Sequence, residues 1–463
     1  MHIEQMYTNC LAEAAYYIES DGVAAIIDPL RETEPYIEKA ASRNAEIKYV
    51  FETHFHADFV SGHIDLAKRT GAQIIYGPEA HTKYAVINAT DGQEFQLGKI
   101  RIRALHTPGH TLESTCYLLI DEQERPYAIF TGDTLFVGDV GRPDLLDGIM
   151  TKEELASRMY DSLNNKIKTL PDEVIVYPAH GPGSACGKSM GKETFSTIGI
   201  QKKTNYALQE MTREQFILAV TDGLSQPPQY FFEDARINKN GYEDIDQVLE
   251  KNVKGLSVSA FEQAVNAGAL ILDTRIADVF EKGFVPGSLN IGLNGMFAVW
   301  VGSLIDINIP LVLITEYGKE SESVLRLARV GYENVIGHLE GGIAAWTQAG
   351  KPVETVQSAH PELMAPVYDN PEYVILDVRK PSEFESEHVK GAVNIPLSDL
   401  QERIAEIDMH KKYFVHCAAG YRSMMAASIL KQNGVTDFVN IYGGWGAIKK
   451  TDLPKESSIP ELA

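Results

Sequence analysis

Metal-binding side chains follow several predicted strands in the first 180 residues of the sequence. The segment Thr53–Asp58 follows the apolar run 49–51, and within it His54, His56 and Asp58 alternate along the chain. Alternate side chains of an extended segment face the same way, so these three can point into one site. Three more strand patterns end at a histidine or an aspartate, namely His110, Asp133 and His180. Because sites in layered α/β proteins gather at the carboxyl ends of strands, the set predicts a metal site.

A histidine taken alone is better interpreted as a packed core or loop residue. We interpret His63, His81 and His106 in that way. For the whole set that interpretation is weak, because histidine, aspartate and Gly/Pro turns recur at every one of these strand ends.

The pattern resembles the metallo-β-lactamase superfamily, whose motif T-H-x-H-x-D-H is followed by a distant His, Asp and His. The resemblance covers residues 1 to about 245. It implies an αββα sandwich that holds metal at one edge of its two sheets.

One position departs from that motif. Members with two metals have histidine after the motif's aspartate, whereas this sequence has Phe59, which cannot bind a metal. A hydrolase that needs two ions is therefore disfavoured. His54, His110 and Asp133 form a two-histidine, one-carboxylate set, which suits one non-haem Fe(II) per chain working on O2, although zinc could occupy the site on purification. The remaining members of the set would orient the ligands or hold waters, namely His56, Asp58 and His180.

Two neighbours of this set are candidate substrate contacts. Arg142 could anchor a substrate carboxylate or phosphate, and a plain salt bridge is the equal alternative. Cys186 lies six residues after His180 in a glycine-rich loop. We place Cys186 near the metal pocket without assigning it essential chemistry, and an ordinary loop thiol remains the alternative.

A cysteine loop near the C-terminus is the second candidate site. The loop Cys417–Ser423 lies between the strand pattern 413–416 and the helical run 424–430. Backbone N–H groups and the helix dipole would stabilise a thiolate there, and Arg422 would add a charge that can pair with a bound anion. A buried structural cysteine is the alternative. The small and polar neighbours of Cys417 argue against it.

The spacing within this loop distinguishes two families. Four residues separate Cys417 from Arg422, whereas cysteine phosphatases have five in a similar loop. The loop resembles that of a rhodanese, a sulfurtransferase whose cysteine carries a persulfide sulfur. Segments 377–379 and 443–445 resemble that family too, and the match covers about residues 365–455.

The second half of the chain contains an internal repeat. Ile271–Arg275 recurs as Ile375–Arg379, and the segment 287–291 recurs as 391–395. In the first copy, Thr315 aligns with Cys417 and Glu320 with Arg422. That copy resembles a rhodanese fold without its nucleophile, for which we expect a structural role.

Length and composition indicate how many domains hold these sites and which partners are excluded. At about 150 residues per domain, the 463 residues suggest three domains of α/β type. We expect a metallo-β-lactamase-like domain over 1–250, an inactive rhodanese-like parallel α/β domain over 251–354, and an active one over 355–463. A net charge of −22 argues against nucleic acid and anionic membranes as partners. No apolar run reaches the ~20 residues needed to cross a bilayer, and four scattered cysteines suit a reducing cytoplasm.

The combination resembles the persulfide dioxygenase–rhodanese fusions of bacterial sulfide oxidation. In that family, Fe(II) binds a low-molecular-weight thiol persulfide (of glutathione, coenzyme A or a similar thiol) and O2, and yields sulfite and free thiol. By this resemblance, Cys417 passes sulfane sulfur to sulfite to give thiosulfate, or runs the reverse transfer. We also expect a homo-oligomer.

Two other classes of function stay open. One is a zinc-dependent thioester or lactone hydrolase of the glyoxalase-II type fused to a sulfurtransferase, against which Phe59 argues. The other is a non-enzymatic sulfur carrier or scaffold, against which the intact set of His54, His110 and Asp133 argues.

Overall fold

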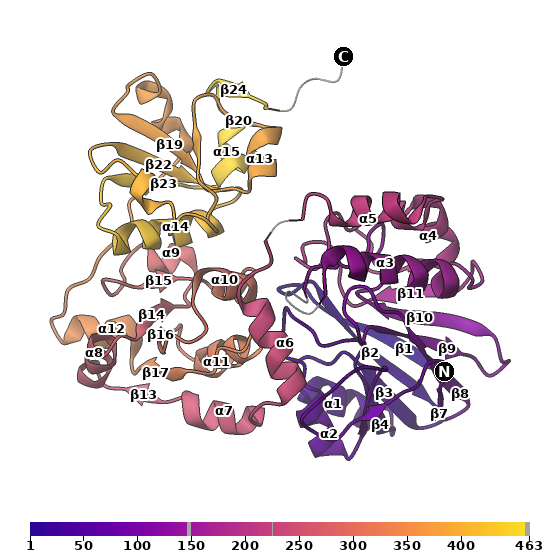
Figure 1. Ribbon diagram of the computed structural model, residues 1–463. Helices are drawn as coiled ribbons and strands as arrows, with labels where there is room; N and C mark the ends of the chain where they lie inside the picture. Colours follow the sequence, from indigo (N-terminus) through magenta and orange to yellow (C-terminus); the bar gives the residue numbers. More distant parts are fainter. Residues whose placement is uncertain (146–149, 225, 459–463) are drawn as a thin grey trace. The chain divides into compact units, whose positions relative to one another are not determined.

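The computed structural model describes residues 1–145, 150–224 and 226–458. They form two compact units (Figure 1). The first unit contains residues 1–248 together with 325–332, and the second contains the remainder. Among the described residues, no helix is long and apolar enough to span a bilayer.

The first unit contains two six-stranded sheets. One sheet has the order β1 (His2–Thr8), β2 (Glu13–Ser20), β3 (Val23–Ile27), β4 (Glu46–Phe51), β5 (Gln73–Tyr76), β6 (Ile87–Asn88). The other has the order β12 (Ser196–Thr197), β11 (Ile175–Pro178), β10 (Pro126–Gly132), β9 (Thr115–Ile120), β8 (Ile100–His106), β7 (Glu94–Leu97). The helices are α1 (Glu34–Ser42), α2 (His63–Thr70), α3 (Lys152–Ser162), α4 (Ile198–Thr204), α5 (Arg213–Thr221), α6 (Tyr230–Asn240) and α7 (Ile245–Asn252).

Apolar side chains on both faces of the strands fix the layer order. Along β2, Tyr16 and Ile18 pack into the core between the sheets, while Ala15 and Tyr17 pack in the cluster with α1. This alternation follows from the two-residue period of a strand, and burial of both faces explains the nearly continuous apolar sequence. Helices α3 and α5 cover the outer face of the second sheet. The expected αββα sandwich is therefore confirmed.

The second unit contains two five-stranded parallel sheets with the same order of equivalent strands. The first has the order β13 (Gly255–Leu256), β17 (Val335–Leu339), β16 (Leu311–Ile314), β14 (Leu270–Asp273), β15 (Leu289–Asn290). The second has the order β18 (Ser358–Ala359), β23 (Phe438–Ile441), β22 (Lys412–His416), β19 (Tyr373–Asp377), β21 (Val393–Asn394), with β20 (His388–Val389) and β24 (Lys455–Glu456) as a separate pair. Their helices are α8 (Val258–Asn266), α9 (Ala277–Phe280), α10 (Phe297–Leu304), α11 (Glu320–Ala328), α12 (Gly342–Gln348), α13 (Pro381–Ser386), α14 (Tyr421–Gln432) and α15 (Gly444–Ile448). The last residues of α11, from 325 onward, are counted with the first unit.

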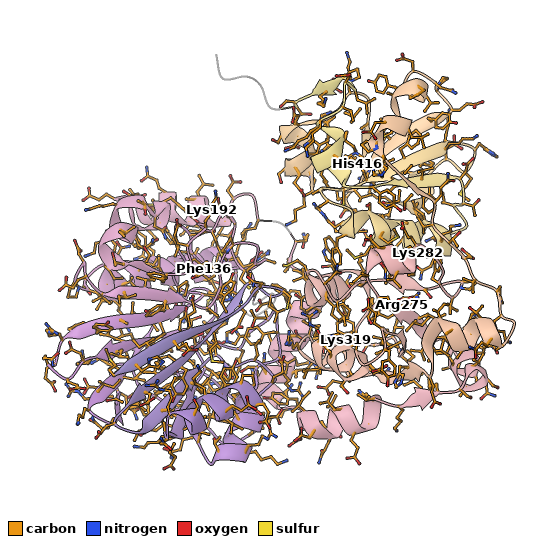
Figure 2. All side chains as sticks on the ribbon, turned by 180° about the vertical axis from the view of Figure 1, so that it is seen from behind. Phe136, Lys192, Arg275, Lys282, Lys319 and His416 are labelled. Carbon is orange, nitrogen blue, oxygen red and sulfur yellow. The ribbon has the colours of Figure 1, made fainter. Side chains whose placement is uncertain are left out.

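The repeated Asp-x-Arg motif forms an internal salt bridge in both copies. Arg275 (Figure 2) binds the Asp273 carboxylate through Nε and Nη2, the latter at 2.6 Å. Arg379 binds Asp377 in the same way, also at 2.6 Å for Nη2. The motif therefore belongs to the fold of each repeat and does not distinguish the repeat with the cysteine from the one without it.

Candidate functional sites

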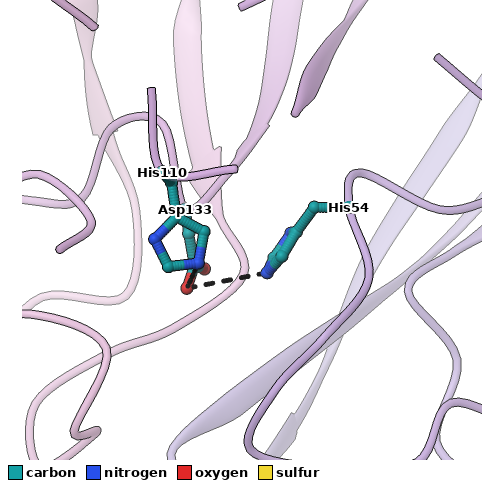
Figure 3. Close-up of side chains that lie close together, drawn as sticks. All are labelled: His54, His110 and Asp133. Atoms are coloured by element: carbon teal, nitrogen blue, oxygen red, sulfur yellow. Dashed lines mark ion pairs between the residues drawn. The ribbon is translucent and has the colours of Figure 1, made fainter. Parts of the chain in front are cut away.

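The three predicted metal ligands converge in the first unit. His54, His110 and Asp133 follow β4, β8 and β10, and each side chain is buried (Figure 3). The Asp133 Oδ2 atom lies 3.8 Å from His54 Nε2 and 3.5 Å from His110 Nε2. These three ligand atoms belong to one group that could hold a metal ion.

Hydrogen bonds at Nδ1 fix the orientation of both histidine rings. Thr53 Oγ1 donates to Asp28 at 2.8 Å, so it accepts the Nδ1 proton of His54 at 2.9 Å. His110 Nδ1 donates to the Arg142 carbonyl at 2.8 Å. Both rings therefore turn Nε2 toward Asp133, the orientation that outer hydrogen bonds give to metal-binding histidines.

The atoms that face one another at this site lack other partners. Among the described residues, His54 Nε2, His110 Nε2 and Asp133 Oδ2 are buried and make no hydrogen bond. Such orphaned groups are rare in folded proteins because they lose their hydration without compensation. Burial and the neighbouring His56 lower the pKa of His54, so its imidazole is neutral. The donor set fits one divalent cation held by two imidazoles and a carboxylate.

His180 connects the two predicted aspartates. Its Nδ1 lies 2.7 Å from Asp133 Oδ1, and its Nε2 lies 2.8 Å from Asp58 Oδ2. Burial alone would lower the pKa of His180, but the two carboxylates raise it well above its usual range. Burial opposes ionisation of Asp133 too, yet His180 and His54 hold the pKa of that carboxyl well below its usual value. His180 therefore holds Asp133 with Oδ2 toward the other histidines.

His56 faces a different set of acids. Its Nε2 lies 3.1 Å from Asp28 Oδ1 and 3.6 Å from Glu52 Oε2. Phe59 is fully buried, and its ring centroid lies 4.3 Å from that of His56. The benzyl side chain thus occupies space beside His56 and offers no ligand.

The two candidate substrate contacts are both buried. Cys186 is 1% exposed, and its sulfur lies within 4.8 Å of ligand atoms of Asp58 and His180. Burial raises the pKa of the Cys186 thiol well above its usual value. Arg142 holds Asp144 through Nε at 2.7 Å and Nη2 at 2.8 Å, the salt bridge that the sequence left open. Its carbonyl oxygen accepts the hydrogen bond from His110 Nδ1.

The cysteine loop lies between β22 and α14. Cys417 is 1% exposed, and the Gly420 N–H donates to its sulfur at 3.1 Å. Gly420 has a φ of 111°, which an L side chain rarely adopts, so glycine is required where the amide turns toward the sulfur. This amide would stabilise a thiolate.

Arg422 is already paired with a carboxylate. Its two terminal nitrogens lie 2.6 and 2.8 Å from the Glu383 carboxylate oxygens. Burial opposes ionisation of Glu383, yet Arg422 lowers the pKa of that carboxyl. The positive charge that the sequence predicts for an anion is therefore compensated by Glu383, which lies 39 residues away along the chain.

Comparisons with known proteins identify both halves. The family model for the metallo-beta-lactamase superfamily matches residues 8–180, and that for the rhodanese-like domain matches residues 257–349 and 360–451. The probable hydroxyacylglutathione hydrolase glo2 of Schizosaccharomyces pombe is 33% identical over 198 residues, which are 42% of this chain and 72% of that protein. The hydroxyacylglutathione hydrolase of Pelagibacter ubique is 31% identical over 183 residues, 38% of this chain and 71% of that protein.

A solved structure is similar over much more of the chain. The metallo-beta-lactamase from Staphylococcus aureus has 31% sequence identity and a TM-score of 0.65, and the match covers 73% of this chain and 98% of that one. The chain belongs to the metallo-beta-lactamase superfamily. Its second half adds two rhodanese-like domains, so the architecture is that of the fusion that the sequence resembles.

The metallo-beta-lactamase domain also contains acids that the sequence analysis missed. Asp28 directly follows β3 and holds both Thr53 and His56, so the strand-end pattern would have found it. Glu13 is fully buried, and neither of its carboxylate oxygens has a hydrogen-bond partner among the described residues. Burial raises the pKa of Glu13 well above its usual value. In the sequence Glu13 is only the polar first residue of an apolar strand.

Proposed function

We propose that the protein is a non-haem Fe(II) persulfide dioxygenase coupled to a sulfurtransferase at Cys417. The observation that carries this proposal is the convergence of His54, His110 and Asp133, with Phe59 at the position where a second metal would need a histidine. In the overall reaction, one thiol persulfide, one O2 and one water give one thiol and one sulfite with two protons. A ferrous ion, when bound, would supply open coordination positions and the electron transfer that O2 requires.

The residues around this site have distinct tasks in the proposal. His54 and His110 present their Nε2 atoms, and Thr53 and the Arg142 carbonyl keep the rings from turning. His180 holds Asp133 in its ionised form. Burial of all these groups excludes bulk water from the site, which strengthens each electrostatic contact.

The second reaction takes place at Cys417. The outer sulfur of a Cys417 persulfide passes to sulfite, which gives thiosulfate and frees the thiol, or the reverse transfer loads the cysteine from thiosulfate. The Gly420 amide stabilises the Cys417 thiolate when it leaves. The proposed partners are a persulfide of glutathione, coenzyme A or a similar thiol, together with O2 and sulfite or thiosulfate. A cytoplasmic homo-oligomer acting in sulfide oxidation completes the proposal, and the four free cysteines suit such a compartment.

The decisive experiment measures O2 uptake by protein prepared without air and given either glutathione persulfide or coenzyme A persulfide. Iron and zinc are quantified on the same sample. We expect persulfide-dependent O2 uptake and sulfite release that scale with iron content. Uptake that does not follow iron would contradict the proposal.

A second candidate function follows from the names of the relatives. Two of them are named hydroxyacylglutathione hydrolases, so a zinc-dependent thioester hydrolase is the alternative. Rapid hydrolysis of a hydroxyacyl glutathione thioester by protein with two zinc ions per chain would favour it. Thioester hydrolysis at background level would exclude it.

A further inference from the structure

A cavity in the second unit lies between the two rhodanese-like repeats. Its volume is about 240 Å3. Ala419, Gly420 and Tyr421 of the Cys417 loop form one side of it, and Asp278, Glu281 and Asn294 of the repeat without a cysteine form the other. The cavity is therefore lined by residues of both copies, and three of them closely follow Cys417 in its loop.

Tyr421 joins the active loop to the other repeat. Its hydroxyl donates to the Gly292 carbonyl at 2.6 Å. A Cβ atom added at Gly295 would lie 2.5 Å from the Tyr421 ring, so glycine is needed for this approach. Farther along α14, Ser428 Oγ accepts from the Asn290 N–H at 3.1 Å. These contacts fix the position of one side of the cavity relative to the other.

The charges on the two sides differ. On the Cys417 side, Arg422 is compensated by Glu383 and Arg379 by Asp377. On the other side, Asp278 is exposed. Within the described part of the chain, the Glu281 carboxylate accepts hydrogen bonds from two uncharged groups, Ser358 Oγ at 2.6 Å and Tyr442 OH at 2.7 Å.

Among the residues that the structure describes, no lysine or arginine lines the cavity. Lys282 (Figure 2) follows Glu281 but is exposed and is not part of the lining. The cavity, lined on one side by residues 419–421 that follow Cys417, therefore has a negative wall that no lysine or arginine in its lining neutralises.

We propose that the repeat without a cysteine selects among the thiols that accept sulfur from Cys417 besides sulfite, and that it favours a thiol that carries a protonated amine. The amine binds at the wall formed by Asp278 and Glu281 while the thiol faces the loop. An anionic acceptor of the same size meets repulsion at that wall. The proposal rests on the sulfurtransferase function proposed above.

The chemical step has no net oxidation. The acceptor thiolate attacks the outer sulfur of the Cys417 persulfide and forms a new S–S bond. The bond between that sulfur and Cys417 Sγ breaks, and Sγ leaves with the electron pair. The proton that the acceptor thiol lost returns to Sγ through solvent. One acceptor thiol and one Cys417 persulfide thus give one acceptor persulfide and the free Cys417 thiol.

The test uses three acceptors of similar size and different charge on the full-length protein. Cysteamine is cationic, 2-mercaptoethanol is neutral and 3-mercaptopropionate is anionic. Cys417 is first loaded with sulfane sulfur from saturating thiosulfate, and loading is verified by intact mass. The rate constant of transfer is then compared per thiolate. We expect cysteamine to react about tenfold faster than 3-mercaptopropionate, with 2-mercaptoethanol between them.

Variants of the wall assign the preference to these residues. Asp278→Lys should remove or reverse the preference, and Glu281→Gln, which keeps one hydrogen-bond acceptor, should weaken it. Asp369→Lys is the matched control, because Asp369 is exposed in the same unit and does not line the cavity. It should leave the preference unchanged.

Two results would overturn the inference in different ways. Equal rates for the three acceptors on loaded protein, or a preference that survives Asp278→Lys, would remove the selective role of the wall and leave the sulfurtransferase intact. Failure of Cys417 to take up any sulfane sulfur would remove both.

Discussion

The metal centre and the cysteine loop both stabilise charged reacting groups, but the chain builds them in opposite ways. The metal centre collects His54, His110 and Asp133 from the ends of three separate strands. The cysteine loop is a continuous segment in which the Gly420 amide folds back onto the sulfur three residues earlier. One site depends on the whole sandwich, and the other depends on a single turn into a helix.

The difference extends to charge. At the metal centre, the facing nitrogen and oxygen atoms have no hydrogen-bond partner among the described residues, so the centre is incomplete without a cation. At the cysteine loop, Arg422 is already neutralised by Glu383. Under the proposed function, the first site would gain its charge from a bound ion, whereas the second would rely on backbone dipoles. If this comparison holds, changes at one site should leave the other intact.

The largest expected effect is that of Cys417→Ser on sulfur transfer. A serine hydroxyl cannot carry a sulfane sulfur, so transfer should fall on the order of 10³-fold or more. Persulfide-dependent O2 uptake should stay within about twofold of the wild type, because the metal ligands come from other segments. Thiosulfate-dependent transfer and an oxygen electrode measure the two activities on one sample. Loss of both activities in this variant would contradict the separation of the two sites.

His110→Ala should have the opposite effect. Removing one of three ligands should lower iron content and O2 uptake by roughly 10–100-fold, since even partners of the ligands contribute this much to metal affinity. Sulfane sulfur loading of Cys417 should be unchanged. Metal analysis and intact mass provide the two measurements. His81→Ala is the control, because His81 is an exposed histidine outside the cluster, and it should retain its metal.

Phe59→His adds a possible metal ligand and so tests whether the metal centre is mononuclear. Phe59 is fully buried against His56, and a histidine there would restore the superfamily motif. The zinc-loaded variant should bind about two zinc ions per chain where the wild type binds about one. Phe59→Leu, which adds no ligand, is the matched control. A wild type that already binds two zinc ions would contradict the assignment of a mononuclear site.

The sequence predicted the two sites with different success, and the reason is physical. The loop Cys417–Ser423 is local, so its position at a helix start followed from residue order alone. The residue order did not predict that the charge of Arg422 is compensated, because its partner Glu383 comes near it only through folding. The strand-end pattern found the residues that converge at the metal centre, because parallel and crossing strands bring their ends to one edge.

The sequence did not predict how the side chains around the metal centre are oriented. The His54 and His56 rings do lie side by side, with centroids 4.2 Å apart. Residues 54–56 do not form a strand, however, and His56 turns its Nε2 toward Asp28 and Glu52. The burial of Glu13 and the pairing of Arg142 with Asp144 also depend on packing. In the Asp-x-Arg repeat, a segment that resembles the rhodanese family forms the same internal salt bridge in both copies, with or without the cysteine.

The smallest expected effect separates the two units by their response to pH. Burial raises the pKa of Asp65 in α2 to about 6, against the opposing charge of Arg31. In the unfolded chain an aspartate has a pKa of about 3.9, so the folded state holds the proton more tightly. The stability contributed by that proton is present below the unfolded pKa and is lost as pH rises through the folded pKa.

Between about pH 5 and about pH 7.5, Asp65 should therefore lower the opening free energy around α2 by about 1 kcal/mol. Asp65→Asn, which cannot ionise, should flatten this part of the profile. Hydrogen exchange of the α2 amides measures it, because protection there reports local opening. Tryptophan fluorescence supplies the control, since Trp300, Trp346 and Trp445 all belong to the second unit. Urea transitions seen by those tryptophans should be the same in both proteins, and a shift in them would show that the pH response of Asp65 is not confined to the metal-binding unit.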